Sequence, residues 1–371
     1  MNVPMLDLSK QYYGLKEQIL AAMDEVMSSS RFILDKNVKK LEHDIAALSC
    51  VPHGVGVANG SDALHISLLA CGIGEGDEVI TTPFTFFATA GAIARIGAKP
   101  VFVDINPQTY NIDPYKIEEK ITAKTKAIIP VHLYGQPAEM DIINEVAKKY
   151  NLMIIEDAAQ AIGAKYKGRM VGELGDAACF SFFPTKNLGA YGDAGMIVTK
   201  HNEVAEKASV IRVHGSKPKY YHHVLGYNSR LDELQAAILN VKLPHLERWS
   251  LARREKADIY TKLLQDSVGE YIQTPYVEAH NYHIYHQYTI RTNRRDELQA
   301  YLKEHGISTM VYYPLPLHLQ PVFSGLGYKK GDLPYSEQAG EEVVSLPMFP
   351  EITAEQQEYV VSNIAAFFYK K

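Results

Sequence analysis

One lysine and one aspartate each stand beside an apolar run that has the length and composition of a buried strand. Lys186 lies in the turn-rich segment SFFPTKNLGAYGDAG, between the apolar runs ACFSFF and GMIVT. Asp157 comes at the end of LMIIED. A lysine in a turn most often faces solvent, and an aspartate after a strand is often a helix N-cap. A buried carboxylate instead needs a cation or hydrogen-bond donors, because an isolated buried charge is costly.

Two other segments carry residues suited to a phosphate and to a flat ring. In VANGSDAL, Gly60 and Ser61 lie between an expected strand and an expected helix, where backbone N–H groups and the helix dipole attract an anion. In TPFTFFATA, Phe86 and Phe87 follow the next expected strand, and an aromatic ring there can lie flat against a heterocycle. Taken singly, each feature has a structural explanation, the serine as a helix cap and the phenylalanines as core.

An α/β sheet would bring these segments together. From residue 54 onward, short β-rich runs alternate with helical patterns: GVGVAN precedes SDALHISLLACG, DEVITTPF precedes FFATAGAIARIG, and KAIIPVHLYG precedes MDIINEVAKKY. This alternation predicts a mainly parallel sheet with helices on both faces. Ligands bind such sheets at the carboxyl ends of the strands, so we expect all four segments to meet at one edge.

One cofactor, pyridoxal phosphate, accounts for all four segments. Its cationic ring nitrogen suits Asp157, its phosphate suits the turn at Gly60 and Ser61, and its flat ring suits a neighbouring phenylalanine. Lys186 would form a Schiff base with the aldehyde. The freed amine, with a lowered pKa, would then act as a general base.

The pattern changes near residue 240. LPHLERWSLARREKADIYTKLL predicts a long amphipathic helix, YHQYTIRT and ISTMVYY predict strands, and RDELQAYLKEHG predicts a helix that stops at Gly306. The terminal helix opens with Thr353 and Gln356 at capping-box spacing. We expect a large domain over residues 1–245 and a smaller α+β domain over 246–371, with about the first 30 residues as a candidate to pack on the small domain.

Composition excludes several classes of protein. The 371 residues include 38 basic and 43 acidic side chains, a net charge of −5 that argues against nucleic acid as a partner. Cys50, Cys71 and Cys179 are scattered in apolar surroundings, so we expect reduced core residues without a disulfide or metal framework. The histidines lack zinc-site spacing, and no metal is expected. No signal pattern or run of 18 apolar residues occurs, which predicts a soluble, cytoplasmic protein with no membrane partner.

Two other functions fit the sequence less well. A nicotinamide-dependent oxidoreductase needs G-x-G-x-x-G at the first helix and an acidic residue about 20 positions later, and GVGVANGS does not fit that spacing. A non-catalytic regulator that binds pyridoxal phosphate would carry a separate DNA-binding domain. No basic helix-turn-helix module precedes residue 54.

Over about residues 30–320, the chain resembles the DegT/StrS family of pyridoxal-phosphate-dependent nucleotide-sugar aminotransferases. The segments that carry the resemblance are SRFILDKNVKKLE, VANGSDAL, TPFTFFATA, PVHLYGQPAEMD, IEDAAQAIGA, SFFPTKNLGAYGDAG, RVHGS, GYNSRLDELQAAIL and YYPLPLHLQP. The resemblance implies the aspartate-aminotransferase-like, type I fold. It also implies a homodimer with shared active sites.

The resemblance also implies a role for individual residues. Lys186 would be the Schiff-base lysine, Asp157 the partner of the pyridine nitrogen, Gln160 the partner of the phenolic oxygen, and Phe86 the cover of the ring. The phosphate contacts would come from Gly60, Ser61, Ser181 and, from the partner subunit, Asn228. Tyr313 and His318 match positions near the sugar nucleotide.

Three departures from the family pattern bear on these expectations. Ala194 stands where the family usually has glycine, which would cost free energy if that position needed a positive φ. Asp35 stands where glycine is common, in a loop expected near the nucleotide. Some relatives have histidine in place of the lysine and dehydrate sugars, but this chain keeps Lys186, which favours transamination.

The segment HGSKPKYYHHVLGYNSRLD bears on the substrate. Lys219, Tyr220 and His222 are suited to a diphosphate and to stacking beside a sugar or base, although a solvated loop is the alternative. The segment is most similar to the family branch that acts on 3-keto sugars. We therefore predict transfer of an amino group, from L-glutamate, to C3 of a dTDP-linked 3-keto-6-deoxyhexose. A UDP-linked 3-keto sugar and a 4-keto sugar nucleotide are the alternatives.

Overall fold

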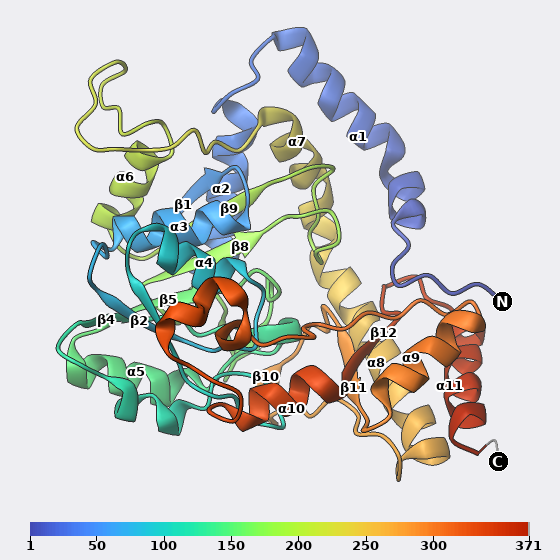
Figure 1. Ribbon diagram of the computed structural model, residues 1–371. Helices are drawn as coiled ribbons and strands as arrows, with labels where there is room; N and C mark the ends of the chain where they lie inside the picture. Colours follow the sequence, from blue (N-terminus) through green and yellow to red (C-terminus); the bar gives the residue numbers. More distant parts are fainter. Residues whose placement is uncertain (370–371) are drawn as a thin grey trace.

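A seven-stranded sheet forms the centre of the first two thirds of the chain. The structure, a computed structural model, describes residues 1–369 (Figure 1). The strands lie in the order β1-β9-β8-β5-β4-β2-β3. Their bounds are β1 His53–Val57, β2 Glu78–Thr81, β3 Lys99–Phe102, β4 Thr125–Ile128, β5 Met153–Asp157, β8 Ala177–Ser181 and β9 Gly195–Thr199.

The strand directions place the predicted site at one edge of this sheet. β3, β2, β4, β5 and β8 pair in parallel, whereas β9 pairs antiparallel with both β8 and β1. The prediction of a mainly parallel α/β sheet is confirmed. Because β9 runs opposite to β8, the loop between them, residues 182–194, begins and ends at the carboxyl edge of β8.

Helices cover both faces of the sheet, as the two-sided burial of its strands requires. One face packs against α2 (Lys36–Leu48), α5 (Met140–Tyr150) and α7 (Glu233–Lys242). The other face packs against α3 (Gly60–Ala70), α4 (Ala88–Arg95) and α6 (Asn202–Ile211). Successive residues of β8 divide between the two layers, with Ala178 and Phe180 in the first and Ala177 and Cys179 in the second.

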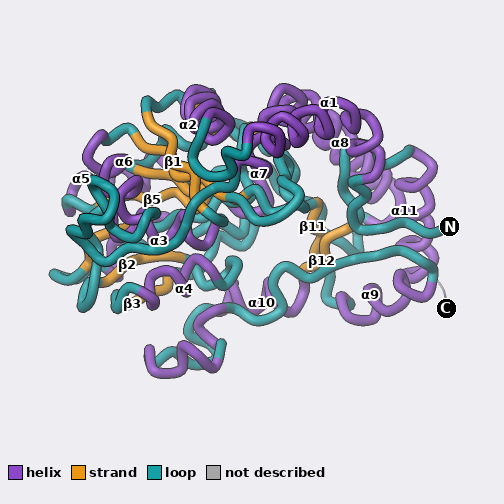
Figure 2. Tube along the Cα trace, turned by 90° about the horizontal axis from the view of Figure 1, so that it is seen from above, coloured by secondary structure: helices purple, strands orange, loops and turns teal. Residues whose placement is uncertain are grey.

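Residues between Ala257 and Ile364, together with Val3, form a second, smaller hydrophobic core. Its helices and strands lie to one side of the large sheet in Figure 2. Its strands β11 (Tyr288–Arg291) and β12 (Val343–Leu346) pair antiparallel. Its helices are α8 (Leu246–Val268), α9 (Arg295–Glu304) and α11 (Ala354–Tyr369), whereas α10 (Pro334–Glu342) packs Ala339 against residues of the large sheet's loops. The expected stop at Gly306 and the expected capping box are both present: Gly306 has a φ of 73°, and Thr353 and Gln356 exchange hydrogen bonds of 3.0 and 3.2 Å. A small three-stranded sheet of β10 (Asn281–Tyr282), β6 (Lys165–Tyr166) and β7 (Arg169–Met170) joins the two parts.

The first 30 residues contact both parts of the molecule. Helix α1 (Ser9–Ser29) packs Leu15 and Ile19 against Ile238 of α7 and Trp249 of α8. Upstream of α1, Val3 forms a parallel bridge with Ile307 and is buried in the core of the smaller part. The division of the chain into domains at residue 245 stays a prediction.

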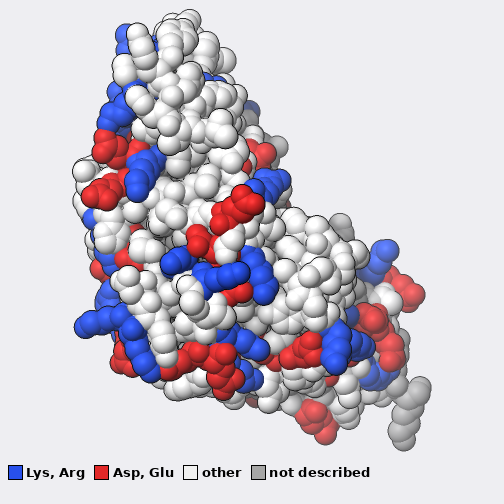
Figure 3. All heavy atoms as spheres, turned by 60° about the vertical axis from the view of Figure 1, so that its left-hand side comes forward, with Lys and Arg blue, Asp and Glu red and all other residues white. Residues whose placement is uncertain are grey.

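Three surface properties bear on the expectations from composition. Within residues 1–369, no helix has both the length and the apolar character that a membrane span requires. The three cysteines are free thiols, but Cys50 is exposed, so its assignment to the core is wrong. On the face in Figure 3, basic and acidic side chains are interspersed rather than gathered in a patch of one sign.

Candidate active site

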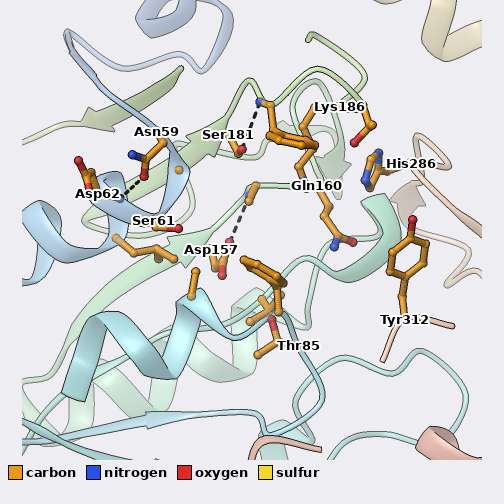
Figure 4. A pocket seen from close by; sticks show the side chains of 18 of the residues that line it. Asn59, Ser61, Asp62, Thr85, Asp157, Gln160, Ser181, Lys186, His286 and Tyr312 are labelled. Atoms are coloured by element: carbon orange, nitrogen blue, oxygen red, sulfur yellow. Dashed lines mark hydrogen bonds between the residues drawn. The ribbon is translucent and has the colours of Figure 1, made fainter. Parts of the chain in front are cut away.

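A cavity of about 820 Å³ lies at the carboxyl ends of β5 and β8 (Figure 4). Residues of the β1–α3 turn, of the start of α4 and of the β8–β9 loop line one side of it. The segment before β11 and the pair Tyr312 and Tyr313 line the other side. The cavity brings together eight of the residues predicted from the sequence: Gly60, Ser61, Phe86, Asp157, Gln160, Ser181, Lys186 and Tyr313.

Lys186 lies in the β8–β9 loop, which folds back on itself through backbone hydrogen bonds. The N–H of Lys186 donates to the carbonyl of Phe183 at 2.8 Å, and that of Ala190 donates to Phe182 at 2.8 Å. Burial lowers the pKa of Lys186 to about 8, and the Asp157 carboxylate acts in the opposite direction. The lowered pKa makes the neutral, nucleophilic amine accessible near neutral pH.

Asp157 is the last residue of β5 and is 5% exposed. Its Oδ2 accepts a hydrogen bond of 2.7 Å from Thr89 Oγ1, and its Oδ1 accepts one of 3.2 Å from the N–H of Ala159. Burial raises the pKa of Asp157, while these bonds and the Lys186 cation oppose that effect. Turns rather than a helix follow β5, so the N-cap explanation is wrong. A buried carboxylate at a cavity wall suits a cationic ligand group.

The β1–α3 turn has the features of a phosphate site. Asn59 caps α3, with its Oδ1 accepting from the N–H of Asp62 at 2.8 Å. Ser61 is therefore not the cap, and within residues 1–369 its hydroxyl has no hydrogen-bond partner. A Cβ on Gly60 would lie 2.6 Å from the Cβ of Ser181. Glycine thus lets the second serine approach the helix N-terminus, where N–H groups and two hydroxyls can receive a phosphate.

The two adjacent phenylalanines have different environments. Phe86 lines the cavity, is 56% exposed, and lies 6.2 Å from the ring of Tyr313. Phe87 instead stacks on Phe323, with ring centroids 5.7 Å apart. Phe86 is therefore the ring placed to cover a flat ligand.

Gln160 links the two sides of the cavity. Its Oε1 accepts from the N–H of Tyr134 at 2.7 Å, which directs its Nε2 toward Tyr313 Oη at 3.1 Å. Burial raises the pKa of Tyr313, so its hydroxyl remains protonated and can donate a hydrogen bond. The pair offers neutral donors and acceptors beside Asp157.

Four predicted residues do not line this cavity. Lys219 and Tyr220 lie in the exposed loop of residues 215–227, which projects beyond α6 (Figure 1). Asn228 forms an antiparallel bridge with Val213 at the base of that loop. His318 is 1% exposed, and its Nε2 bonds to Glu337 at 3.0 Å, so the structure does not bring it to the cavity.

Other residues of the site were not selected from the sequence. Thr89 bonds to Asp157, Tyr312 stands beside the predicted Tyr313, and His286 and Gln287 line the cavity from the smaller part of the chain. Tyr312 could have been predicted, because it is adjacent to Tyr313 in VYYP. The spacing of residues in YHIYHQY does not indicate that His286 lines the cavity, because that contact depends on where the two parts of the chain meet.

The two glycine replacements cause no backbone strain. Ala194 is buried and does not have a positive φ, so its methyl group is accommodated. Asp35 precedes α2 with a φ of −107°, and its N–H donates to Glu233 Oε1 at 2.7 Å.

One group of residues has the spacing of metal ligands but lies outside the cavity. Possible ligand atoms of Glu139, Glu278 and His280 lie within 4.8 Å of one another. Glu139 and His280 already bond to each other at 2.8 Å. Their geometry is that of an ordinary ion-pair cluster.

The chain is similar in sequence to a known family of proteins and to individual members of it. A family model described as the DegT/DnrJ/EryC1/StrS aminotransferase family matches residues 14–365. The chain is 68% identical over 368 residues to a pleiotropic regulatory protein of Geobacillus stearothermophilus, covering 99% of each. It is 48% identical over 354 residues to a UDP-N-acetyl-3-dehydro-alpha-D-glucosamine 3-aminotransferase of Acidithiobacillus ferrooxidans, covering 95% of each.

Among solved structures, the chain is similar to DesV of S. venezuelae, whose crystal structure contains a ketimine intermediate. The TM-score is 0.97 at 40% identity, covering 100% of this chain and 99% of that one. The prediction of a type I aminotransferase fold is confirmed by this likeness.

Proposed function

Since the chain belongs to the DegT/DnrJ/EryC1/StrS aminotransferase family, we propose that it transfers an amino group from L-glutamate to C3 of a dTDP-linked 3-keto-6-deoxyhexose. At the level of the family, it is a pyridoxal-phosphate-dependent aminotransferase that acts on nucleotide-linked keto sugars. The predictions of the enzyme class and of the cofactor are therefore confirmed. The residue roles, the position of amination, the nucleotide and the donor belong to the proposal.

The observation that carries the proposal is the pairing of Asp157 with Lys186 in one cavity beside the seat formed by Gly60, Ser61 and Ser181. The unpartnered Ser61 hydroxyl and the buried carboxylate fit the phosphate and ring nitrogen of pyridoxal phosphate. When bound, that group supplies an electron sink for the carbon losing a proton. Asp157 would keep the ring nitrogen protonated, and Phe86 would cover the ring.

Lys186 would carry the proton in each half of the exchange. Its lowered pKa suits a group that must take up a proton and return it near neutral pH. Gln160 would bond to the phenolic oxygen of the ring, and Tyr313, which accepts a hydrogen bond from Gln160 Nε2, would lie near the sugar nucleotide, because both residues line the cavity with Asp157.

Amination at C3 is supported by the name of the Acidithiobacillus relative, a 3-aminotransferase, which acts on a UDP-linked sugar. The nucleotide of this chain's substrate is proposed as dTDP, with UDP as the alternative. Moving the keto group by one carbon rotates the sugar while the diphosphate stays fixed. One regioisomer should therefore dominate.

We also propose that the active unit is a homodimer in which Asn228 of the partner subunit reaches the phosphate. The support is the projecting loop of residues 215–227, where Leu225 is 96% exposed and Tyr220 is 79% exposed. Such apolar exposure marks a surface that another protein surface covers. Lys219 would then approach the diphosphate of a substrate bound by the partner. The free thiols fit a reducing compartment, and we place the enzyme in the cytoplasm.

The decisive experiment offers the holoenzyme glutamate with a 3-keto or a 4-keto dTDP-sugar, and with the UDP-linked 3-keto sugar, and locates the new amine by NMR. We expect amination of the dTDP-linked 3-keto sugar and none with the Lys186→Ala control. Efficient amination at C4 alone would contradict the position, and a preference for UDP would correct the nucleotide.

A regulatory function is the alternative that the name of the Geobacillus relative raises. The match to an aminotransferase family model over residues 14–365, and the 48% identity to a 3-aminotransferase, favour catalysis. Absence of turnover with every sugar, together with tight cofactor binding, would favour the regulator.

A further inference from the structure

The wall of the cavity opposite the sheet carries a buried histidine that the proposed chemistry does not use. His286 is 5% exposed and lies in the segment just before β11. In Figure 4 its ring stands in the space between Lys186 and Tyr312. The position is that of a group facing whatever reacts at the lysine.

The backbone around His286 is held firmly in place. Arg253 of α8, itself 3% exposed, donates from Nη1 to the carbonyl of Tyr285 at 3.1 Å and to that of His286 at 3.4 Å. The N–H of Gln287 donates to the carbonyl of Tyr134 at 3.3 Å, in the same turn that orients Gln160. The ring is therefore positioned before any ligand arrives.

The hydrogen bonds assign the tautomer of His286. Asn187 donates from Nδ2 to the carbonyl of Ile284 at 3.2 Å, so its Oδ1 is the atom that faces His286. The distance from that Oδ1 to Nδ1 of His286 is 3.1 Å. Because an amide oxygen only accepts, Nδ1 carries the proton and Nε2 has a free lone pair.

The lone pair on Nε2 has a poor partner inside the chain. Among the described residues its hydrogen-bond partner is Nε2 of Gln287 at the long distance of 3.5 Å, and Gln287 also bonds to Tyr312. Burial, and then the cations Lys186 and Arg253 and the neighbouring His283, hold the pKa of His286 well below its usual range. His286 is thus a neutral, under-satisfied acceptor, and such a group favours a ligand that brings a donor.

We propose that Nε2 of His286 accepts a hydrogen bond from a hydroxyl of the amino-accepting sugar, on a carbon next to the one that is aminated. The inference rests on the proposed function. An amino acid donor presents carboxylates, whose oxygens a lone pair repels, whereas a keto sugar presents hydroxyl donors. The place of His286 beside Lys186 puts that hydroxyl close to the reacting carbon. His286 is thereby a specificity-determining residue that selects sugars with this hydroxyl.

A matched pair of variants tests the proposal. His286→Asn keeps an N–H donor toward Asn187 but removes the atom at Nε2, whereas His286→Gln keeps a polar atom near Nε2. The two half-reactions of the holoenzyme can be followed separately by stopped flow. For the half-reaction with the keto sugar, we expect His286→Asn to lower the apparent second-order rate constant by about tenfold to a hundredfold. We expect the half-reaction with glutamate to change by less than about threefold, and His286→Gln to recover part of the loss.

A binding measurement separates this proposal from the proposed function. Calorimetry with the holoenzyme and the nucleotide-linked 3-keto sugar, without an amino donor, should show weaker binding for His286→Asn by about tenfold, and an analogue that lacks the neighbouring hydroxyl should bind both proteins alike. Equal loss for sugar and analogue, or a loss confined to the glutamate half-reaction, would overturn the role of His286. Failure of the wild type to aminate any keto-sugar nucleotide would instead overturn the proposed function.

Discussion

Two loops of similar length differ in how they are held to the rest of the molecule. The β8–β9 loop, residues 182–194, is pinned from α7: Gln235 accepts from the N–H of Tyr191 at 2.9 Å, and Lys242 donates to the carbonyl of Gly189. The loop of residues 215–227 is held mainly by its own backbone, as in the 2.9 Å bond from the N–H of His223 to Gly215. Its apolar side chains project outward.

The loop that is anchored to α7 carries the lysine proposed for the chemistry, and the exposed loop carries the residues proposed to recognise the substrate. A residue that must hold a proton at one atom needs a loop fixed by neighbours in the same chain, and Lys186 has such a loop. The second loop is tied to α6 by the ion pair between Lys217 and Glu206, but Lys219 and Tyr220 are exposed, so their proposed role depends on a second surface. The following changes test whether the two loops divide the work in this way.

Lys186→Ala should have the largest effect. No other amine of the cavity can carry the proton, so turnover should fall by at least about a thousandfold while the fold is retained. Lys219→Ala, in the other loop, is the matched control and should keep measurable turnover. Borohydride reduction followed by peptide mapping should label Lys186, and a label on any other lysine would refute the assignment.

Asp157→Asn should bind the cofactor but turn over about a hundredfold to a thousandfold more slowly, because an amide does not keep the ring nitrogen cationic. Steady-state kinetics with absorbance spectra of the bound cofactor measure both quantities. Near-normal turnover would remove Asp157 from the chemistry and leave it the structural role of accepting hydrogen bonds from Thr89 and Ala159.

Mixing two inactive variants tests the second loop. If Asn228 of the partner subunit completes each site, a dimer of one Lys186→Ala and one Asn228→Ala subunit has one intact site and one doubly defective site. Random exchange should then restore about a quarter of the wild-type activity. No recovery after subunit exchange has been demonstrated would argue that each chain is self-sufficient.

Lys242→Met should change stability more than chemistry. Lys242 is 2% exposed and 4.9 Å from the Tyr191 ring centroid, and burial lowers its pKa from 10.5 to about 8. Between these values the unfolded chain binds more protons, so the wild type gains stability as pH rises from 8 to 10.5.

The gain relative to the methionine variant should be on the order of 3 kcal/mol, because one pKa unit corresponds to about 1.4 kcal/mol. Urea unfolding of both proteins at several pH values measures it. Below pH 8 the difference between the two proteins should be constant, and an opposite trend above pH 8 would show that Lys242 is not a buried cation.

Local patterns were enough to predict the sheet and the residues that line the cavity at the carboxyl ends of β5 and β8. Alternating strands and helices fix which residues follow each strand, so Asp157, Lys186 and Gly60 could be placed at one edge. Residues supplied by long-range packing could not be placed this way. His286 reaches the cavity only because Arg253 and the turn at Tyr134 fix its backbone, and no spacing encodes those contacts.

His318 has a partner that the sequence does not reveal. A polar residue near matching motifs was expected at the substrate, but Glu337 bonds to it and buries it. A histidine with a carboxylate partner and one without look alike in a sequence, because the partner lies 19 positions away on another helix.

The placement of α1 has a consequence for synthesis on the ribosome. The apolar residues Leu15 and Ile19 can be buried only after Ile238 and Trp249 have been synthesised. Val3 can form its bridge only after Ile307 has been synthesised. Residues 1–30 are thus made well before the residues that they pack against. Through much of translation α1 carries an uncovered apolar stripe, a surface that favours aggregation of the unfinished chain.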